Sequence, residues 1–112
     1  MVSRELVAAS ARPLVLSILG EGASYGYAII QRVRELSGDQ LEWTDGMLYP
    51  VLHRLEKEGL IEAEWVRADS GRERKYYRLT DSGKKAKRQE QAEWLKVHNA
   101  MARLWKIKPV SI

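Results

Sequence analysis

The chain has 112 residues, no cysteine and a formal net charge of +4, which excludes disulfides and thiolate metal sites. Its hydrophobic content of 45% suits one small domain. No apolar run approaches the roughly 20 residues that cross a bilayer, and the N-terminal sequence is too polar for a secretory signal. The sequence therefore predicts a soluble cytoplasmic protein with no membrane partner and no cofactor.

The charges are unevenly distributed along the chain. Residues 41–66 carry two cations against six acids, whereas residues 67–88 carry nine cations against three acids. A basic segment beside an acidic one favours a polyanion bound in one preferred orientation. Composition by itself leaves a merely solvated basic face equally open.

The first half of the chain reads as helices. The apolar run at 14–19 predicts a buried helix, with Pro13 in its first turn and Ser10 as its N-cap. Residues 1–9 would then form a separate loose turn. Ser24 is expected to cap a second helix with apolar residues at helical spacing.

A third helix is predicted over residues 44–58, with Thr44 or Asp45 as its cap. At 100° per residue, one side is apolar and consists of Leu48, Val51, Leu52 and Leu55. The other side and its flanks carry Gly46, Tyr49, Pro50, His53, Arg54 and Lys57. The outward surface of this helix is therefore cationic and suited to phosphates and base edges.

Two alternating segments follow, "LIEAEWV" and "RKYYRLT", and they predict the strands of a hairpin with its turn at Gly71. The first strand has an apolar face made of Ile61, Ala63 and Trp65. On the second strand we assign Tyr77 to the core.

Three helices followed by a hairpin are typical of a winged helix-turn-helix. The predicted fold class is mainly α with a small β-hairpin, in which residues 1–80 form a DNA-binding domain. The wing, residues 67–76, would lay its cations Arg72, Arg74 and Lys75 along a phosphate backbone or in the adjacent minor groove.

The final helix, expected over residues 81–108 with a tail at 109–112, carries two apolar stripes in its second half. Trp94, Val97, Met101 and Leu104 form one stripe, and Leu95, His98, Ala102 and Trp105 form the other. Two stripes exceed one intramolecular contact, so we expect a homodimer interface. For Trp94, ordinary packing in this interface and a platform for a planar aromatic effector both stay open.

The stretches "SYGYAIIQRV", "DGMLYPVLHRLEKEGLI" and "GRERKYYRLTDSGKKA" resemble the PadR-type transcriptional regulators, and the likeness runs from Leu14 to Trp105. The resemblance implies a homodimeric repressor that binds a palindromic operator and releases it on sensing a ligand or stress. It also implies that Tyr25, Gly26 and Tyr27 lie near the DNA backbone. The single C-terminal helix suggests the family's short branch, and Pro13 departs from the family's usually continuous first helix.

The sequence therefore predicts a DNA-binding regulator of transcription whose partner is double-stranded DNA. An enzyme is not expected, because the two histidines, His53 and His98, lie on different helices, and no phosphate-binding glycine loop or metal site is present. The alternative from another class is a winged helix that binds proteins instead of DNA. The expected DNA contacts are Tyr25, Gly26, Tyr27, Thr44, Gly46, Tyr49, Pro50, His53, Arg54, Lys57, Gly71, Arg72, Arg74 and Lys75.

Overall fold

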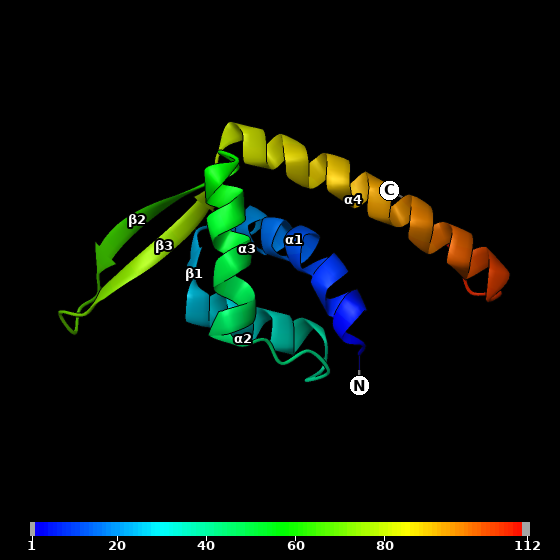
Figure 1. Ribbon diagram of the computed structural model, residues 1–112, viewed down its shortest axis with the longest axis horizontal. Coiled ribbons are helices and arrows are strands. Elements are labelled where there is room, and N and C mark those ends of the chain that lie inside the picture. The colour runs from blue at the N-terminus through cyan, green and yellow to red at the C-terminus, as the bar shows by residue number, and fades with distance from the viewer. Residues whose placement is uncertain (1, 111–112) are drawn as a thin grey trace.

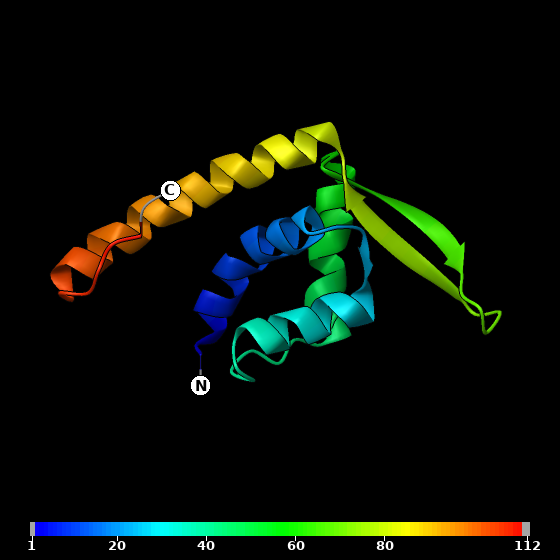
Figure 2. The same cartoon turned by 180° about the vertical axis from the view of Figure 1, so that it is seen from behind.

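The computed structural model describes residues 2–110, which form four helices and a three-stranded sheet (Figure 1). In chain order the elements are α1 (Arg4–Gly20), β1 (Ser24–Tyr25), α2 (Gly26–Leu36), α3 (Asp45–Lys57), β2 (Ile61–Arg67), β3 (Glu73–Leu79) and α4 (Asp81–Leu104). This order confirms the predicted winged helix-turn-helix with a long final helix. The hairpin and the distal half of α4 project from opposite sides of the helical core (Figures 1 and 2).

Helix α1 is continuous and longer than predicted. Its N-cap is Ser3, whose side chain accepts a hydrogen bond from the Leu6 amide at 3.2 Å. Ser10 is not a cap, because it lies within the helix and its hydroxyl donates to the Leu6 carbonyl at 2.8 Å. The expected loose turn at 1–9 is therefore wrong from residue 4 onward, and residue 1 lies outside the described residues. Pro13 stands mid-helix, where it removes one amide donor.

Ser24, which was expected to cap α2, lies in a short strand instead. Ser24 pairs with Tyr77 and Tyr25 pairs with Tyr76, so β1 is antiparallel to β3 in a sheet of order β1-β3-β2. Tyr25 then occupies the N-cap position of α2 and makes no capping hydrogen bond with its side chain. The prediction of Ser24 as a cap was wrong because the pairing with β3 continues through Tyr25, so α2 begins only at Gly26.

Helix α3 begins and ends close to the predicted bounds. Thr44 is its N-cap residue, although its side chain makes no capping hydrogen bond. At the other end Gly59 adopts a φ of 76°, and the Leu60 amide donates to the Leu55 carbonyl at 3.0 Å. This is the Schellman arrangement, in which a left-handed residue reverses the chain after a helix. It turns the chain directly into β2.

The hairpin runs beyond the hydrophobic core. Its register pairs Ile61 with Leu79 at the base and Arg67 with Glu73 near the turn. Tyr77 is 1% exposed, which confirms its assignment to the core. Trp65 lies on the same face but is 64% exposed, so the apolar face predicted for this strand is buried only near the base.

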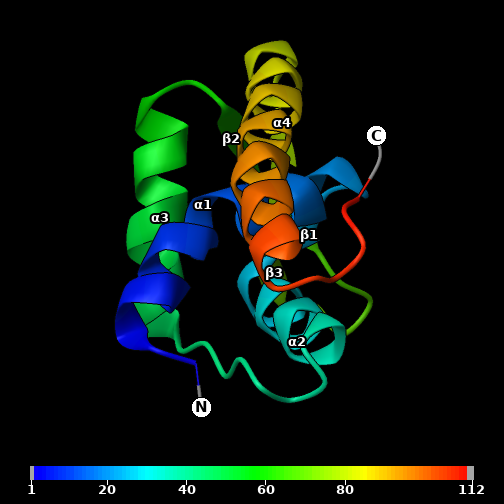
Figure 3. The same ribbon diagram turned by 90° about the vertical axis from the view of Figure 1, so that its right-hand side faces the viewer.

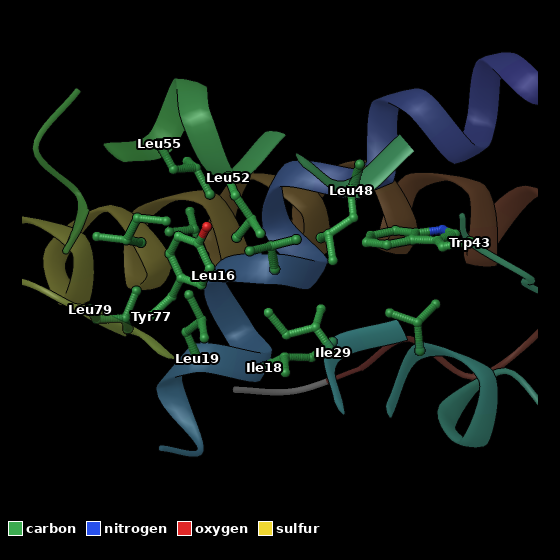
Figure 4. Packing of buried hydrophobic residues seen from close by; sticks show 14 residues of the cluster. Leu16, Ile18, Leu19, Ile29, Trp43, Leu48, Leu52, Leu55, Tyr77 and Leu79 are labelled. Atoms are coloured by element: carbon green, nitrogen blue, oxygen red, sulfur yellow. The ribbon is translucent and has the colours of Figure 1, made fainter. Parts of the chain in front are cut away.

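The core joins α3 to α1 and to the sheet. Leu48, Leu52 and Leu55 of α3 are fully buried and point toward α1, where Leu16 is also fully buried (Figure 4). Tyr77 lies beside them (Figure 4). The apolar stripe of α3 thus fixes which side of this helix remains on the surface.

Helix α4 ends at Leu104, four residues before the predicted end at 108. Lys106 adopts a left-handed φ of 59°, and the Ile107 amide donates to the Ala102 carbonyl at 2.9 Å. The tail then turns back beside the helix (Figure 3), where Asn99 exchanges two hydrogen bonds of 2.8 and 2.9 Å with the Val110 backbone. A helix cap, and not Pro109, therefore ends α4.

The first turn of α4 is fixed to the chain segment that follows α3. The Thr80 hydroxyl accepts from the Gly83 amide at 3.0 Å and donates to the Gly59 carbonyl at 2.7 Å. The Thr80 amide donates to the Leu60 carbonyl at 3.0 Å. A Cβ at position 83 would overlap that same Leu60 carbonyl oxygen, so this close approach requires glycine.

A partly exposed arginine links three helices. Arg12 of α1 contacts Glu58, just after α3, at 2.6 Å and Glu90 of α4 at 3.0 Å. Its hydrogen bond lowers the pKa of the Glu58 carboxyl below the ordinary value. The pair therefore stabilises the fold at pH above that ordinary value, and its contribution is lost as the pH falls through the lowered pKa.

Replacing Gly83 by alanine should destabilise the protein by about 1–3 kcal/mol, because the new methyl group would overlap the backbone after α3. Urea unfolding followed by circular dichroism measures the change. Gly46→Ala is the matched control, since a Cβ there is 3.8 Å from its nearest neighbour and alanine favours a helix by about 1 kcal/mol. Equal stability of the wild type and Gly83→Ala would contradict the constraint.

Candidate nucleic-acid interface

One side of α3 is available to a ligand. The α3 residues predicted to contact DNA are all exposed: Thr44, Gly46, Tyr49, Pro50, His53, Arg54 and Lys57. They face away from the buried Leu48, Leu52 and Leu55. The acid in the first turn of this helix is Asp45, and the cations in its last turn are Arg54 and Lys57.

The start of α2 packs against α3 through a glycine. Gly26 is buried, and a Cβ built on it would lie 2.6 Å from the Tyr49 hydroxyl oxygen. Any larger residue would push the Tyr49 side chain away from this position. The ring of Tyr49 also lies 6.3 Å from that of His53, measured between centroids. Gly26 therefore allows the Tyr49 side chain to lie close to the start of α2.

The side chain of Tyr25 contacts Arg74 of the wing. Its ring lies 5.1 Å from the Tyr76 ring in an edge-on arrangement, and the Arg74 guanidinium carbon lies 4.6 Å from the Tyr25 ring centroid. Arg74 also donates a hydrogen bond of 3.3 Å to the Tyr25 hydroxyl. Tyr27, by contrast, is 66% exposed.

The wing carries cations without acidic partners. Gly71 adopts a φ of 84° in the turn, where the Ala68 amide donates to the Arg72 carbonyl at 2.8 Å. Among the described residues, no ion pair involves Arg72, Arg74 or Lys75. Arg78 differs, since it pairs with Glu62 at 2.9 Å and Glu64 at 3.3 Å.

The start of α2, Tyr49 on the exposed side of α3, and the hairpin meet at one groove of about 480 Å³. We call it the wing groove, and it is lined by Tyr25, Gly26, Tyr27, Tyr49, Trp65, Arg72, Glu73, Arg74 and Lys75. Seven of these residues were predicted as DNA contacts from three separate parts of the sequence. The remaining predicted contacts lie on the exposed surface of α3 or, for Gly71, in the wing turn.

Trp65 and Glu73 line the wing groove but were not among the DNA contacts predicted from the sequence. The period-2 pattern placed Trp65 on the inner face of the hairpin, and inner-face residues are normally buried. The length of the strand could have indicated that Trp65 is exposed, because a seven-residue strand extends beyond the edge of a small core.

A second groove of about 490 Å³ lies between α1 and α4. Trp94 and Leu95 of α4 line it, together with residues of α1 and the loop before α3: Leu6, Ser10, Pro13, Leu14, Ser17 and Leu41. Val97, Leu104 and Trp105 are 56%, 79% and 64% exposed, whereas His98 and Met101 are half-buried. Ala102 is fully buried, next to the returning tail.

Within residues 2–110, neither a metal site nor a membrane span has structural support. No group of three or more His, Asp or Glu side chains is arranged to hold a metal ion in that part of the chain. None of the helices described there combines the length and apolarity that a bilayer requires.

Comparisons with known proteins agree with this architecture. Residues 15–89 match the family described as Transcriptional regulator PadR-like. The transcriptional regulator Rv3488 of Mycobacterium tuberculosis is 37% identical over 83 residues, covering 74% of each protein. The negative transcriptional regulator PadR of Bacillus subtilis is 34% identical over 84 residues, which span 75% of this chain and 44% of that protein.

A solved structure of a transcriptional regulator from Clostridium thermocellum has a TM-score of 0.81 and 29% identity, covering 92% of this chain and 97% of that one. The fold and the match over residues 15–89 indicate the same family. This chain belongs to the PadR-like family of transcriptional regulators.

Proposed function

We propose that this DNA-binding regulator is a homodimeric repressor that recognises a palindromic operator in the cytoplasm. Helix α3 would enter the major groove while the wing lies along the neighbouring backbone. The observation that carries the proposal is the wing groove, where Arg72, Arg74 and Lys75 of the wing line one surface with Tyr49 of α3.

Charge supports this arrangement. Arg72, Arg74 and Lys75 have no acidic partners in the part of the chain that is described, so a phosphate would not have to displace an internal ion pair. The N-terminus of α3 adds free amides and a partial positive charge. Phosphate contacts of this kind fix orientation, whereas His53 and Arg54 are suited to base edges.

The dimer is proposed from α4 and the groove beside it. Helix α4 exposes Val97, Leu104 and Trp105, while the groove between α1 and α4 is mostly apolar. A second copy related by twofold symmetry can offer its own stripe to this surface and receive the same contact in return. One copy has one reading helix, so a palindrome requires two.

Repression is proposed by likeness to the Bacillus subtilis relative, whose name describes a negative regulator. A protein that occupies an operator blocks polymerase without further chemistry, so no catalytic group is required. Release by a planar aromatic effector at Trp94 is a further part of the proposal, supported by the position of this half-buried indole in the groove between α1 and α4.

Selection of bound duplexes from a random DNA pool should enrich a palindrome with half-sites about one helical turn apart, near 10 base pairs. Arg72→Ala with Lys75→Ala should weaken binding to this duplex and lower its log–log salt slope by up to about 1.8. Lys84→Ala with Lys85→Ala, which removes the same charge from α4, is the matched control. A pool with no enriched sequence would favour the protein-binding alternative.

Met101→Glu should shift the sedimenting species from dimer to monomer, because it would bury an unpaired carboxylate in the proposed interface. Analytical ultracentrifugation at equal protein concentrations makes the comparison. Lys96→Glu, an acid on the opposite side of the same helix, should leave the dimer intact. A dimer that persists in Met101→Glu would move the interface elsewhere.

A planar aromatic compound such as a naphthol should quench the tryptophan fluorescence of the wild type, and Trp94→Phe should lose most of that quenching. Trp105→Phe is the control, since its indole lies outside the groove between α1 and α4. The effector proposal fails for the compounds tested if Trp94→Phe and the wild type are quenched equally.

A further inference from the structure

An exposed tryptophan lies on the hairpin, two residues before the wing. Trp65 of β2 is 64% exposed and lies directly opposite Lys75 of β3 in the hairpin register. A single exposed apolar side chain is common on protein surfaces, but Trp65 shares one groove with three other aromatic residues: Tyr25, Tyr27 and Tyr49. Its neighbour Val66 is 41% exposed and points to the other face of the hairpin.

The inner face of the hairpin directs Trp65 toward the reading helix. Side chains alternate along β2, so Trp65 shares a face with Ala63 and, across the register, with the buried Tyr77. Near the base this face covers the core; farther out it lines the wing groove together with Tyr49 of α3. Trp65 therefore lies between the two elements proposed to contact DNA.

A single sugar–phosphate strand separates the major groove from the adjacent minor groove. A protein with a helix in one groove and a wing along the other must hold that strand between them. The phosphates of the strand require cations and hydrogen-bond donors, whereas its deoxyribose rings present apolar carbon atoms.

The wing groove offers both kinds of surface. Arg72, Arg74 and Lys75 supply positive charge, and Tyr27 and Tyr49 carry hydroxyl groups. Trp65 supplies the largest apolar surface on the wing side of the groove. Glu73 is the one acid in its lining, and two arginines flank it in sequence.

We propose that Trp65 packs its indole against a deoxyribose of the strand seated in the wing groove. The proposal rests on the proposed DNA-binding function and assigns an apolar, non-electrostatic contact to a wing otherwise defined by its charge. Because a sugar contact carries no base information, this contribution to affinity should be the same for operator and random duplex.

The test is a salt titration of DNA affinity, followed by fluorescence anisotropy of a labelled duplex. Trp65→Ala should weaken binding by about tenfold, the order of affinity that burial of a large apolar side chain contributes. Its log–log salt slope should equal that of the wild type, because no charge is removed. The wing variant lacking Arg72 and Lys75 provides the contrast, since its slope should fall.

Trp65→Phe should keep most of the affinity, and Val66→Ala should keep all of it, because Val66 lies on the opposite face of the same strand. Thermal melting by circular dichroism checks that each variant is folded. As a second measurement, DNA should protect the wild type from acrylamide quenching more than it protects Trp65→Phe.

Unchanged affinity in Trp65→Ala would overturn the proposal, and so would a reduced salt slope, which would mean that the indole acts by arranging cations. A loss confined to the operator would also overturn it, since it would indicate base readout. If the wild type bound no duplex, the proposed DNA-binding function itself would be wrong. If the wild type binds DNA and Trp65→Ala binds it equally well, only the proposed Trp65 contact is wrong.

Discussion

The burial of Tyr77 in the core that the sheet shares with α1 and α3 is the constraint on which the rest of the molecule depends. Tyr77 of β3 is 1% exposed, and burial raises the pKa of its hydroxyl, which has no hydrogen-bond partner among the described residues. An unpaired buried hydroxyl costs about 1–3 kcal/mol. Burial of the aromatic ring in the same core as Leu52 and Leu55 offsets this cost, and this shared core holds the base of the hairpin next to α3.

The elements that follow from local periodicity were predictable from the sequence. Spacing of 3.6 identified the buried stripe of α3, and spacing of two identified Tyr77 as a core residue. The errors arose where tertiary contacts overrode a local signal. Ser24 has the chemistry of a helix cap but pairs with β3, far along the chain. Pro13 has the chemistry of a helix start, yet the Ser3 cap and the burial of Ala11 extend the helix before it.

The sequence predicted which residues make up the candidate site better than it predicted how they contact one another. The sequence named Tyr25, Arg74 and most other residues that line the wing groove, but not that the tyrosine hydroxyl accepts a hydrogen bond from the arginine. Such an arrangement depends on the register between β1 and β3, which no local pattern specifies. Trp65 was missed for a related reason, because its exposure depends on where the core ends along the hairpin. Arg78 looked like its neighbours in sequence, whereas ion pairs with β2 neutralise it.

The close contact at Gly83 fixes the first turn of α4 to the backbone after α3. From Gly83 to Leu104 the helix continues for about 33 Å at 1.5 Å per residue. A tilt of this helix by only about 5° would displace its far end by about 3 Å. In two copies joined at their far ends, such a tilt would alter the spacing of the paired α3 helices by roughly the rise of one base pair, about 3.4 Å. A molecule this small could thus lose its match to an operator without any change within its DNA-binding half.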